Sequence, residues 1–513
     1  MPAAEKAAFV SAFIIAFASH LFVYVQPYYG DHGYALITAP AAVGSSGRWL
    51  SAIVNRISYF YLMPLVYGLF VSLFLALATV FICKIFAIKN KVGAVIMGAV
   101  IVTFPSISNI NLFLYDTPNF HLAALLAVLC VFICQRYRWG FLAGAPVLMS
   151  VLAIYQAMIG VACVLCVFIL LQQVAGSEFG YKKTGTLALR FLLMGILGGV
   201  FYALSLFINA RFFDVGLIGH RGMDVQSMAY RMSGVRMIAH VLREVYHEFF
   251  YVLFSGRQYM IAGQLMFAYA LLALLFTFLI ISIIIKQKMY RQALRLALFI
   301  LLILLIPLAA NLARFFSDDR TEIRMLFAGA LLFVLCIILM EQTVSMAGLL
   351  KSSILLCLLF IAFNFIIVNN VYYLQAYFYN QTTKSISTRI AARVEPHLAN
   401  AASGQIIFIG GIPNEHLRLI SNEFTENPGW QSYPLNTNKG SYFIQMQSDS
   451  RYAQEVFARN MTNLHGLPLR MLRNRRRGNA IREQVIESNM PVWPMEGAVG
   501  VIDDVIVVNF GSQ

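Results

Sequence analysis

An aspartate and an arginine stand seventeen positions apart near the start of this apolar chain. Asp31 lies in the segment YVQPYYGDHGY, where the first apolar run ends, and Arg48 follows in SSGRWL. A carboxylate fixed at a membrane surface can act as a general base on a hydroxyl group, and a solvated loop acid is the alternative. An arginine can bind a phosphate with its planar guanidinium group or lie among lipid headgroups. The pair therefore predicts chemistry on a lipid phosphate at the membrane surface.

Other polar residues interrupt the apolar runs further along the chain. Asp116 lies in LYDTPNF, and Tyr155 and Gln156 separate two short apolar runs. Polar groups in lipid are often functional, so we predict that these three residues contact a substrate, together with His32 beside the first acid. A helix-start signal is the alternative explanation for Asp116. Packing between helices is the alternative for the other two.

A short segment beyond residue 310 concentrates charge of both signs. The loop 315–324 contains FSDDRTEIR, and an arginine precedes it. The predicted phosphate ligands there are Arg314, Arg320 and Arg324, and the predicted ligands of a polyhydroxyl group are Asp318 and Asp319. Arginine suits the first role because its fork of N–H donors matches phosphate oxygens. Mutual ion pairing within the turn is the alternative.

The composition places most of the chain in a lipid membrane. Of 513 residues, 60% are hydrophobic and 12% are charged, and the mean hydropathy is +0.72, whereas globular domains carry roughly 25% charged residues. Apolar runs that can cross about 30 Å of hydrocarbon recur over residues 1–375. We predict about eleven transmembrane helices, at 9–27, 59–82, 93–114, 120–135, 140–155, 157–173, 191–209, 265–285, 296–314, 325–341 and 353–373. The net charge of +15 is explained by cytoplasmic loops, so no nucleic-acid partner is predicted.

Basic residues determine the predicted orientation. Lysines and arginines cluster in four loops, near residues 84–91, 136–138, 182–183 and 286–295. Alternating helices put all four loops on one side, which their positive charge marks as cytoplasmic together with the N-terminus. The predicted external loops are 28–58, 115–119, 210–264 and 315–324. With an odd number of helices, residues 376–513 are external as well.

Residues 376–513 have the polarity of a soluble domain. The pattern predicts helices at 384–400 and 450–464, a strand in QIIFIGG, and a hairpin around the Asp-Asp pair at 503–504. About 130 residues are enough for a small α/β domain. An arginine cluster at 470–477 suits anionic lipid or a pyrophosphate, and a solvated face is the alternative.

Four segments of the chain together resemble a known family. They are the external aspartate followed by GRWL, the YDTPNF loop, YQA at 155–157 and the ending MPVWPMEGAVGVIDDVIVV. In order and spacing they resemble the bacterial and phage serotype-converting O-antigen glucosyltransferases of the Gtr type, over nearly the whole chain. The resemblance implies a polytopic GT-C-like membrane fold, an external active site, and an acid on the first external loop, here Asp31, as the base. Many relatives carry two adjacent acids where this chain has Asp31-His32, which argues against a metal site there.

The resemblance also implies the substrates and the compartment. The donor would be undecaprenyl-phosphate-glucose, and the acceptor would be the lipopolysaccharide O-antigen repeat on undecaprenyl pyrophosphate. The reaction would invert at glucose on the periplasmic side of the bacterial inner membrane, among membrane lipids, with no cofactor. The chemistry agrees, because nucleotide sugars are not supplied outside the cytoplasm. A departing phosphate also needs no general acid, unlike glycoside hydrolysis, which uses two carboxylates.

Three other classes of membrane protein stay open as alternatives. An O-antigen polymerase or ligase also uses lipid-linked sugars and external arginines. A flippase or transporter of polyprenyl-linked sugars explains polar groups inside the membrane but not a folded external domain. A membrane scaffold without catalysis is the third. Loss of glucosyl transfer in Asp31→Asn, with folding retained, separates a transferase from all three.

Overall fold

The computed structural model describes residues 1–26, 47–56, 63–212, 234–254, 263–315, 321–342, 348–401, 403–412 and 451–511. Five predicted site residues lie outside the described residues, namely Asp31, His32, Asp318, Asp319 and Arg320. The chain forms two compact units, which divide between Val371 and Tyr372 within one long helix. The boundary expected from the sequence, between 375 and 376, falls four residues further along.

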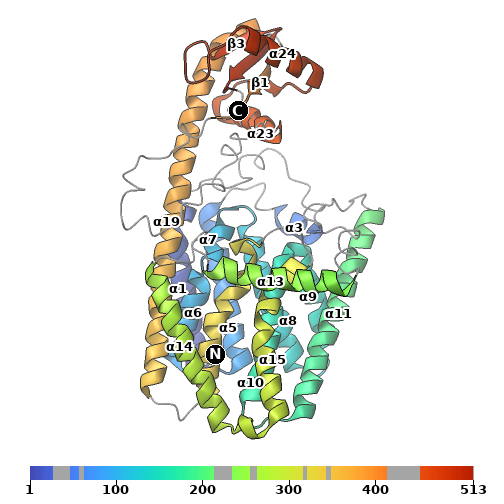
Figure 1. Ribbon diagram of the computed structural model, residues 1–513, viewed down its shortest axis with the longest axis vertical. Coiled ribbons are helices and arrows are strands. Elements are labelled where there is room, and N and C mark those ends of the chain that lie inside the picture. The colour runs from blue at the N-terminus through green and yellow to red at the C-terminus, as the bar shows by residue number, and fades with distance from the viewer. Residues whose placement is uncertain are drawn as a thin grey trace. The chain divides into compact units, whose positions relative to one another are not determined.

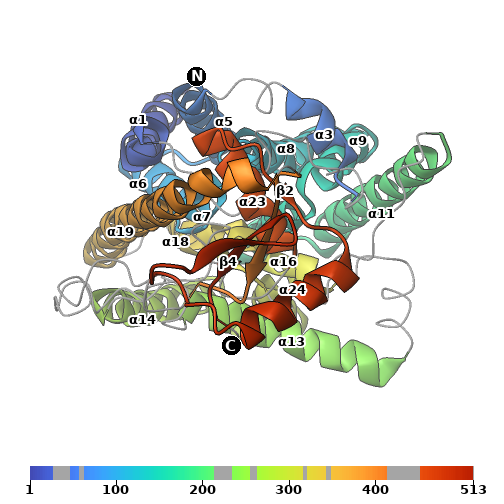
Figure 2. The same cartoon turned by 90° about the horizontal axis from the view of Figure 1, so that it is seen from above.

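The first unit consists of apolar helices (Figure 1). Its N-terminal helices are α1 (Ala3–Val25), α3 (Trp49–Val54), α5 (Pro64–Phe86), α6 (Lys91–Thr103), α7 (Ser106–Asn111), α8 (Thr117–Arg136), α9 (Gly140–Tyr155), α10 (Ile159–Ala175) and α11 (Tyr181–Phe212). They are followed by α13 (Val235–Phe254), α14 (Gly263–Lys286), α15 (Ala293–Leu304), α16 (Ile306–Ala310), α17 (Leu312–Phe315), α18 (Ala330–Gln342) and the start of α19 (Gly348–Val394). Seen from above, α1, α5, α8, α9 and α11 follow one another along one edge (Figure 2). Helix α10 packs against α8 and also against α15 and α18.

Eight segments of the described chain are long and apolar enough to cross a membrane. They are Ala3–Val25, Pro64–Phe86, Thr117–Arg136, Gly140–Ala175, Tyr181–Phe212, Leu265–Lys286, Ala293–Ala310 and Gly348–Phe378. Two shorter apolar helices, Lys91–Thr103 and Phe327–Glu341, accompany them. The chain is therefore a mostly helical, polytopic membrane protein, as its composition predicts. The count of eleven spans stays a prediction.

Prolines divide two of the predicted membrane helices. The predicted helix 93–114 is interrupted at Phe104, which has an extended ψ of 131° before Pro105. A clash with the ring of a following proline disfavours the helical conformation. The predicted helix 296–314 divides into α15, α16 and α17, with Pro307 at the start of α16. Continuous hydrophobicity does not reveal such breaks, because it reports burial in lipid and not backbone conformation.

Arginines on neighbouring helices cap the C-terminal ends of α8 and α10. Arg190 donates hydrogen bonds to carbonyl oxygens at the end of α8, including that of Cys134. Arg295 donates to the carbonyl oxygens of Val174 and Gly176 at 2.9 and 2.6 Å. The last carbonyls of a helix have no partner within it and carry partial negative charge. These bonds pair the partial negative charge at the C-terminal ends of α8 and α10 with the positive charges of Arg190 and Arg295.

Helix α13 lies across the other helices (Figure 1). Its buried side chains include Val241, Val245 and Phe249, which recur every four residues, whereas Val235 is exposed. The sequence predicts an amphipathic helix from Met223 to Phe254, and the described part of it, from Val235 on, is this helix. One face therefore packs on the unit while the other carries polar residues.

The second unit is a small α/β domain with a four-stranded sheet of order β2-β1-β4-β3. The strands are β1 (Gln405–Ile409), β2 (Arg470–Met471), β3 (Val499–Ile502) and β4 (Val505–Asn509). Strand β1 is parallel to β2 and to β4, with Phe408 opposite Val508, and β3 is antiparallel to β4. The β3–β4 hairpin turns at the predicted Asp503-Asp504 pair. Both residues have positive φ, 47° and 59°, as a type I′ turn requires.

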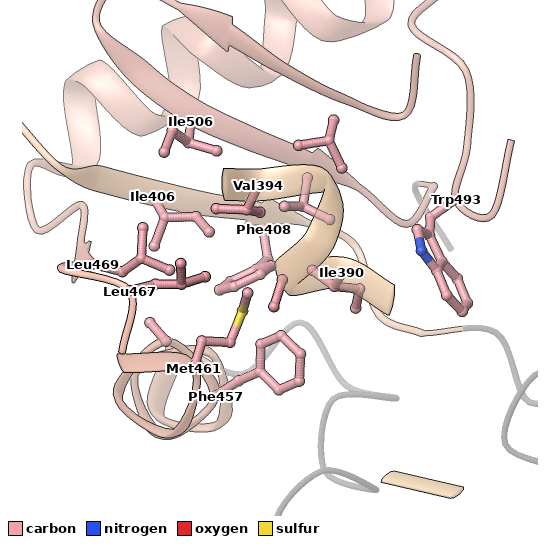
Figure 3. Close-up of a cluster of buried hydrophobic side chains, with 14 of the residues drawn as sticks. Ile390, Val394, Ile406, Phe408, Phe457, Met461, Leu467, Leu469, Trp493 and Ile506 are labelled. Carbon is pink, nitrogen blue, oxygen red and sulfur yellow. The ribbon is translucent and has the colours of Figure 1, made fainter. Parts of the chain in front are cut away.

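Helices cover both faces of this sheet. On one face, Ile406 and Phe408 of β1 pack with the end of α19 and with Phe457 of α23 (Arg451–His465), as Figure 3 shows. On the other face, Ile407 and Ile409 pack with α24 (Arg475–Glu487). Alternate residues of a strand point to opposite faces, so the apolar run 406–409 indicates burial on both sides.

The sequence-based helix at 384–400 is not a separate element. Helix α19 runs without interruption from Gly348 to Val394, followed by the 3-10 helix η8 (Glu395–Asn400). The link between the two predicted helices, QAYFYNQTTK, is polar but contains no glycine or proline. Residues 384–400 are therefore helical as predicted, but they continue the last membrane helix, because polarity ends a membrane span without ending a helix.

Candidate active site

Polar residues from separate segments meet at the ends of several helices of the first unit. Arg48 precedes α3, Asn55 ends it, and Asp116 precedes α8. Gln156 begins the 3-10 turn η2 (Gln156–Met158), which separates α9 from α10. Because all of these positions are helix ends, their side chains are held by packed helices on either side.

A chain of hydrogen bonds fixes Arg48. Its Nε donates to Oε1 of Gln156 at 3.0 Å, and Nε2 of Gln156 donates to the hydroxyl of Tyr202 at 3.2 Å. That hydroxyl donates in turn to the carbonyl oxygen of Gly47 at 3.2 Å. Gly47 has a φ of +77°, and a Cβ there would lie 2.5 Å from the Tyr202 hydroxyl. The close approach requires glycine beside the arginine.

Aromatic rings support the same arginine. Cζ of Arg48 lies 4.9 Å from the centre of the Tyr155 ring, a cation–π distance. The Tyr155 ring stacks on Phe120 of α8, with centroids 4.0 Å apart and an interplanar angle of 14°. Both predicted residues of the α9–α10 break, Tyr155 and Gln156, therefore orient Arg48.

Asp116 is a partly buried carboxylate with an altered pKa. The buried Asn55 donates a hydrogen bond to its Oδ1, and the side chain makes no capping bond to the backbone of α8. Burial raises the pKa of Asp116 to about 6, although Asn55 and the positive charges of Arg48 and Arg324 lower it. The helix-start signal gave the position correctly, but the carboxylate is used for a different contact. A carboxylic acid that ionises near neutrality is a common feature of functional sites.

Arg324 brings a second positive charge to Asp116. It lies in the 3-10 helix η6 (Ile323–Met325), and its Cζ is 4.5 Å from the centre of the Phe113 ring. Its Nη2 pairs with Oε2 of Glu322 at 2.8 Å. We call Arg48, Asp116 and Arg324 the Asp116 centre. It contains two arginines whose charges act on one titratable acid.

Arg314 belongs to a different group. Its side chain is only 5% exposed and pairs with Glu244 and Glu248 of α13 at 2.8 and 2.9 Å. Glu248 also accepts hydrogen bonds from the amide and the hydroxyl of Thr321, at 2.7 and 2.6 Å. We call Arg314, Glu244 and Glu248 the Arg314 centre. Two carboxylates already hold this arginine, and its role as a phosphate ligand stays a prediction.

The structure thus assembles five of the predicted site residues, which are Arg48, Asp116, Tyr155, Gln156 and Arg324. Reasoning from the sequence missed Asn55 and Tyr202. A signal for Asn55 exists, because it lies seven residues after Arg48 and so on the same face of a helix. Tyr202 and Ser205 are polar residues one helical turn apart in an apolar run, and Ser205 accepts a hydrogen bond from Nε1 of Trp49 at 3.0 Å.

A search for metal-binding groups gives a negative result for the described part of the chain. There, no three or more His, Cys, Asp or Glu side chains are grouped so that they could hold a metal ion. The positive charges that act on Asp116 in the described structure are those of Arg48 and Arg324.

The fold and this site define a polytopic membrane protein with a charged centre where its helices end. The family model described as Glucosyl transferase GtrII matches residues 20–320, more than half of the chain. The chain belongs to this family of glucosyl transferases, which confirms the resemblance to Gtr-type enzymes. The match includes Arg48, Asp116, Tyr155 and Gln156 and ends before Arg324. No protein of curated function and no solved structure matches the chain.

Proposed function

We propose that this protein transfers glucose from undecaprenyl-phosphate-glucose to the O-antigen repeat on undecaprenyl pyrophosphate, at the periplasmic face of the bacterial inner membrane. Membership of the glucosyl transferase family supports a sugar donor and a sugar acceptor. The observation that carries the choice of a lipid-linked donor is the Asp116 centre, a charged group among apolar, membrane-length helices. A donor dissolved in the membrane reaches such a site, whereas a soluble nucleotide sugar does not.

Arg48 and Arg324 are the proposed ligands of the donor phosphate. The donor is a phosphodiester with one negative charge, and breaking the bond to glucose gives a phosphomonoester with an additional charge. Donors placed where charge develops stabilise the transition state more than the ground state. The bond from Arg48 to Gln156 and the contact of Arg324 with Phe113 support this role, because they fix both guanidinium groups before the substrate binds. Arg320, outside the described residues, stays a further candidate.

Asp116 is proposed to contact the same phosphate as a neutral acid. A phosphate beside the two arginines would add negative charge near a carboxyl whose pKa is already raised to about 6. A nearby like charge raises the pKa of an acid further, so the carboxyl would take up a proton when the donor binds. The protonated acid can then donate a hydrogen bond to a phosphate oxygen.

Asp31 remains the proposed general base. It would take the proton of the acceptor hydroxyl while that oxygen attacks the anomeric carbon of glucose, and the bond to the phosphate breaks on the opposite side. One displacement inverts the configuration, so a β-linked donor gives an α-glucosyl branch. His32, Asp318 and Asp319 are proposed to contact the sugars, with Asp31 close to the acceptor.

The direct test uses purified protein in lipid nanodiscs with glucosyl-phosphoryl-undecaprenol and a lipid-linked O-antigen repeat. We expect a new glucose branch, detected by mass spectrometry of the released saccharide. UDP-glucose, offered alone as the donor, should give none. Transfer from UDP-glucose would reject the lipid-linked donor. Movement of the donor across the bilayer without any transfer would favour a flippase.

A further inference from the structure

A second polar region lies at the opposite end of α8 from the Asp116 centre. Asp116 precedes the first residue of this 20-residue helix, and Arg190 binds carbonyl oxygens at its last turn and just beyond it. At 1.5 Å per residue the two ends are roughly 30 Å apart, which is the thickness of the hydrocarbon core. Chemistry at this end is therefore separate from the proposed glucosyl transfer.

This end contains a cavity of about 860 Å³. The residues that carry its charge are Lys182 and Lys183, at the start of α11, and Arg190, two turns further along the same helix. No carboxylate belongs to the described residues that line it. Glu178 lines a smaller adjoining pocket with Lys183, yet within the described chain the two side chains form no ion pair. Three positive charges therefore converge on one cavity without a neutralising acid among the residues that line it.

The arginine is fixed toward the cavity wall. Its Nη2 donates hydrogen bonds to the carbonyl oxygens of Cys134 and Tyr137. Its Nε is buried, and none of the described residues provides it with a hydrogen-bond partner. The first N–H groups of α11 also lack partners within their helix, and such helix starts attract anions. The cavity thus combines side-chain and backbone donors that suit one phosphate.

An apolar surface continues from the cavity along α11. Leu189, Leu192, Ile196 and Val200 are each more than half exposed, and their spacing puts them on one face of the helix. Trp139, close to the end of α8, is also largely exposed, as aromatic residues at a membrane interface often are. A soluble anion needs neither the exposed apolar face of α11 nor Trp139 for binding, whereas a lipid can contact both.

We infer that this cavity binds the phosphate of an anionic phospholipid, with its acyl chains along the exposed face of α11. Basic pockets between membrane helices attract anionic headgroups. The three cations neutralise the phosphodiester, and the exposed leucine, isoleucine and valine side chains contact the hydrocarbon. The bound lipid would hold the ends of α8 and α11 together, since Arg190 already joins them.

The test uses the full-length protein in detergent micelles, with phosphatidylglycerol as the probe and phosphatidylcholine as the zwitterionic control. Thermal unfolding and native mass spectrometry report binding. We expect phosphatidylglycerol to raise the unfolding temperature and to remain bound in a one-to-one complex. Lys182→Gln/Lys183→Gln should weaken this binding about 30-fold. Lys182→Arg/Lys183→Arg, which keeps the charge, should bind as the wild type does.

The matched control is Lys89→Gln/Lys91→Gln, which removes two exposed lysines at the predicted cytoplasmic side but outside the cavity. It should bind phosphatidylglycerol as the wild type does. Equal loss in this control would show a general effect of surface charge and overturn the site. Equal protection by inorganic phosphate would show a site for a free anion and overturn the lipid assignment. Equal protection by phosphatidylcholine would overturn recognition of negative charge.

Discussion

The Asp116 centre and the Arg314 centre both consist of arginines and carboxylates, but in different numbers. In the first, two arginines act on a carboxyl whose pKa is raised to about 6, and Glu322 pairs with Arg324 at 2.8 Å. In the second, two carboxylates hold one arginine at 2.8 and 2.9 Å. The first centre becomes more positive when Asp116 takes up a proton near pH 6. In the second, the charge of the arginine is already shared between two carboxylates.

This difference separates a centre that can receive an anion from one that holds helices together. At the Arg314 centre each charged group already has a partner from another element, and Glu248 also binds the amide of Thr321. Breaking one contact there leaves a buried charge without compensation, which costs stability. At the Asp116 centre, an amide and an aromatic ring position Arg48, and Glu322 and the Phe113 ring position Arg324. We therefore expect substitutions to affect catalysis at the first centre and folding at the second.

The largest expected effect concerns the proposed general base. Asp31→Asn should reduce turnover by about 10²-fold or more, because a general base contributes roughly 10² to 10⁴ in rate. Membrane insertion and donor binding should be unchanged, which gel filtration and donor titration can check. Turnover close to that of the wild type would instead move the base to Asp116 or to the Asp318-Asp319 pair. If the base is Asp116, the Asp116 centre is an acid–base centre.

The second-largest expected effect concerns the two arginines of the Asp116 centre. Arg48→Lys and Arg324→Lys should each lower kcat/KM for the donor by about tenfold, because lysine keeps the charge but loses the planar fork. Arg314→Lys is the matched substitution at the other centre and should leave kcat/KM within about twofold, because Glu244 and Glu248 hold this guanidinium group. A tenfold loss would support the predicted phosphate role of Arg314. EDTA should change nothing. If EDTA abolishes activity while both lysine variants behave as wild type, a bound metal holds the phosphate.

A smaller effect is a pH dependence of donor binding. The folded-state pKa of Asp116 is about 6, and the donor phosphate should raise it. Donor binding is then accompanied by proton uptake, so affinity falls as pH rises above 6. For a rise of one pKa unit, KM for the donor increases about fivefold between pH 6 and pH 8. Asp116→Asn should lose this dependence and keep most of its turnover.

The opposite pH dependence would contradict the neutral-acid role. If activity falls as pH drops below 6, and Asp116→Asn is inactive, the ionised carboxylate does the chemistry. Stability provides an independent check of the pKa itself. Because the folded protein binds this proton more tightly than the unfolded chain, stability from Asp116 should decline as pH rises from about 4 to 6. Asp116→Asn should not decline in that range.

The sequence predicted membrane helices well because their signal is local. Each needs only a run of apolar residues long enough for the bilayer, and α1, α5, α8 and α11 follow such runs. The break at Phe104 was not predicted, because one extended residue hardly changes the hydropathy of its neighbourhood. The break at Tyr155 and Gln156 was predicted, because these two polar residues separate two apolar runs. Within the site, the types of Arg48 and Asp116 suggested a function. Asn55 and Tyr202 help to position these residues through contacts between distant parts of the chain. Asn55 and Asp116 are 61 positions apart, and Gln156 and Tyr202 are 46 positions apart. A single sequence does not reveal such contacts.

The smallest expected effect on catalysis belongs to the Arg314 centre, where the loss should be one of stability. Glu248→Gln removes a charge that binds Arg314 and both polar groups of Thr321, so we expect a loss of about 2 kcal/mol in the free energy of unfolding. Glu244→Gln is the control. Within the described chain, the partners of Glu244 are Arg314 and the exposed His240, so this variant should lose less of the free energy of unfolding. Denaturation in detergent measures both. KM for the donor should stay within about twofold of the wild-type value, since neither glutamate belongs to the Asp116 centre. A large increase in KM with unchanged stability would place Arg314 among the phosphate ligands and remove the distinction between the two centres.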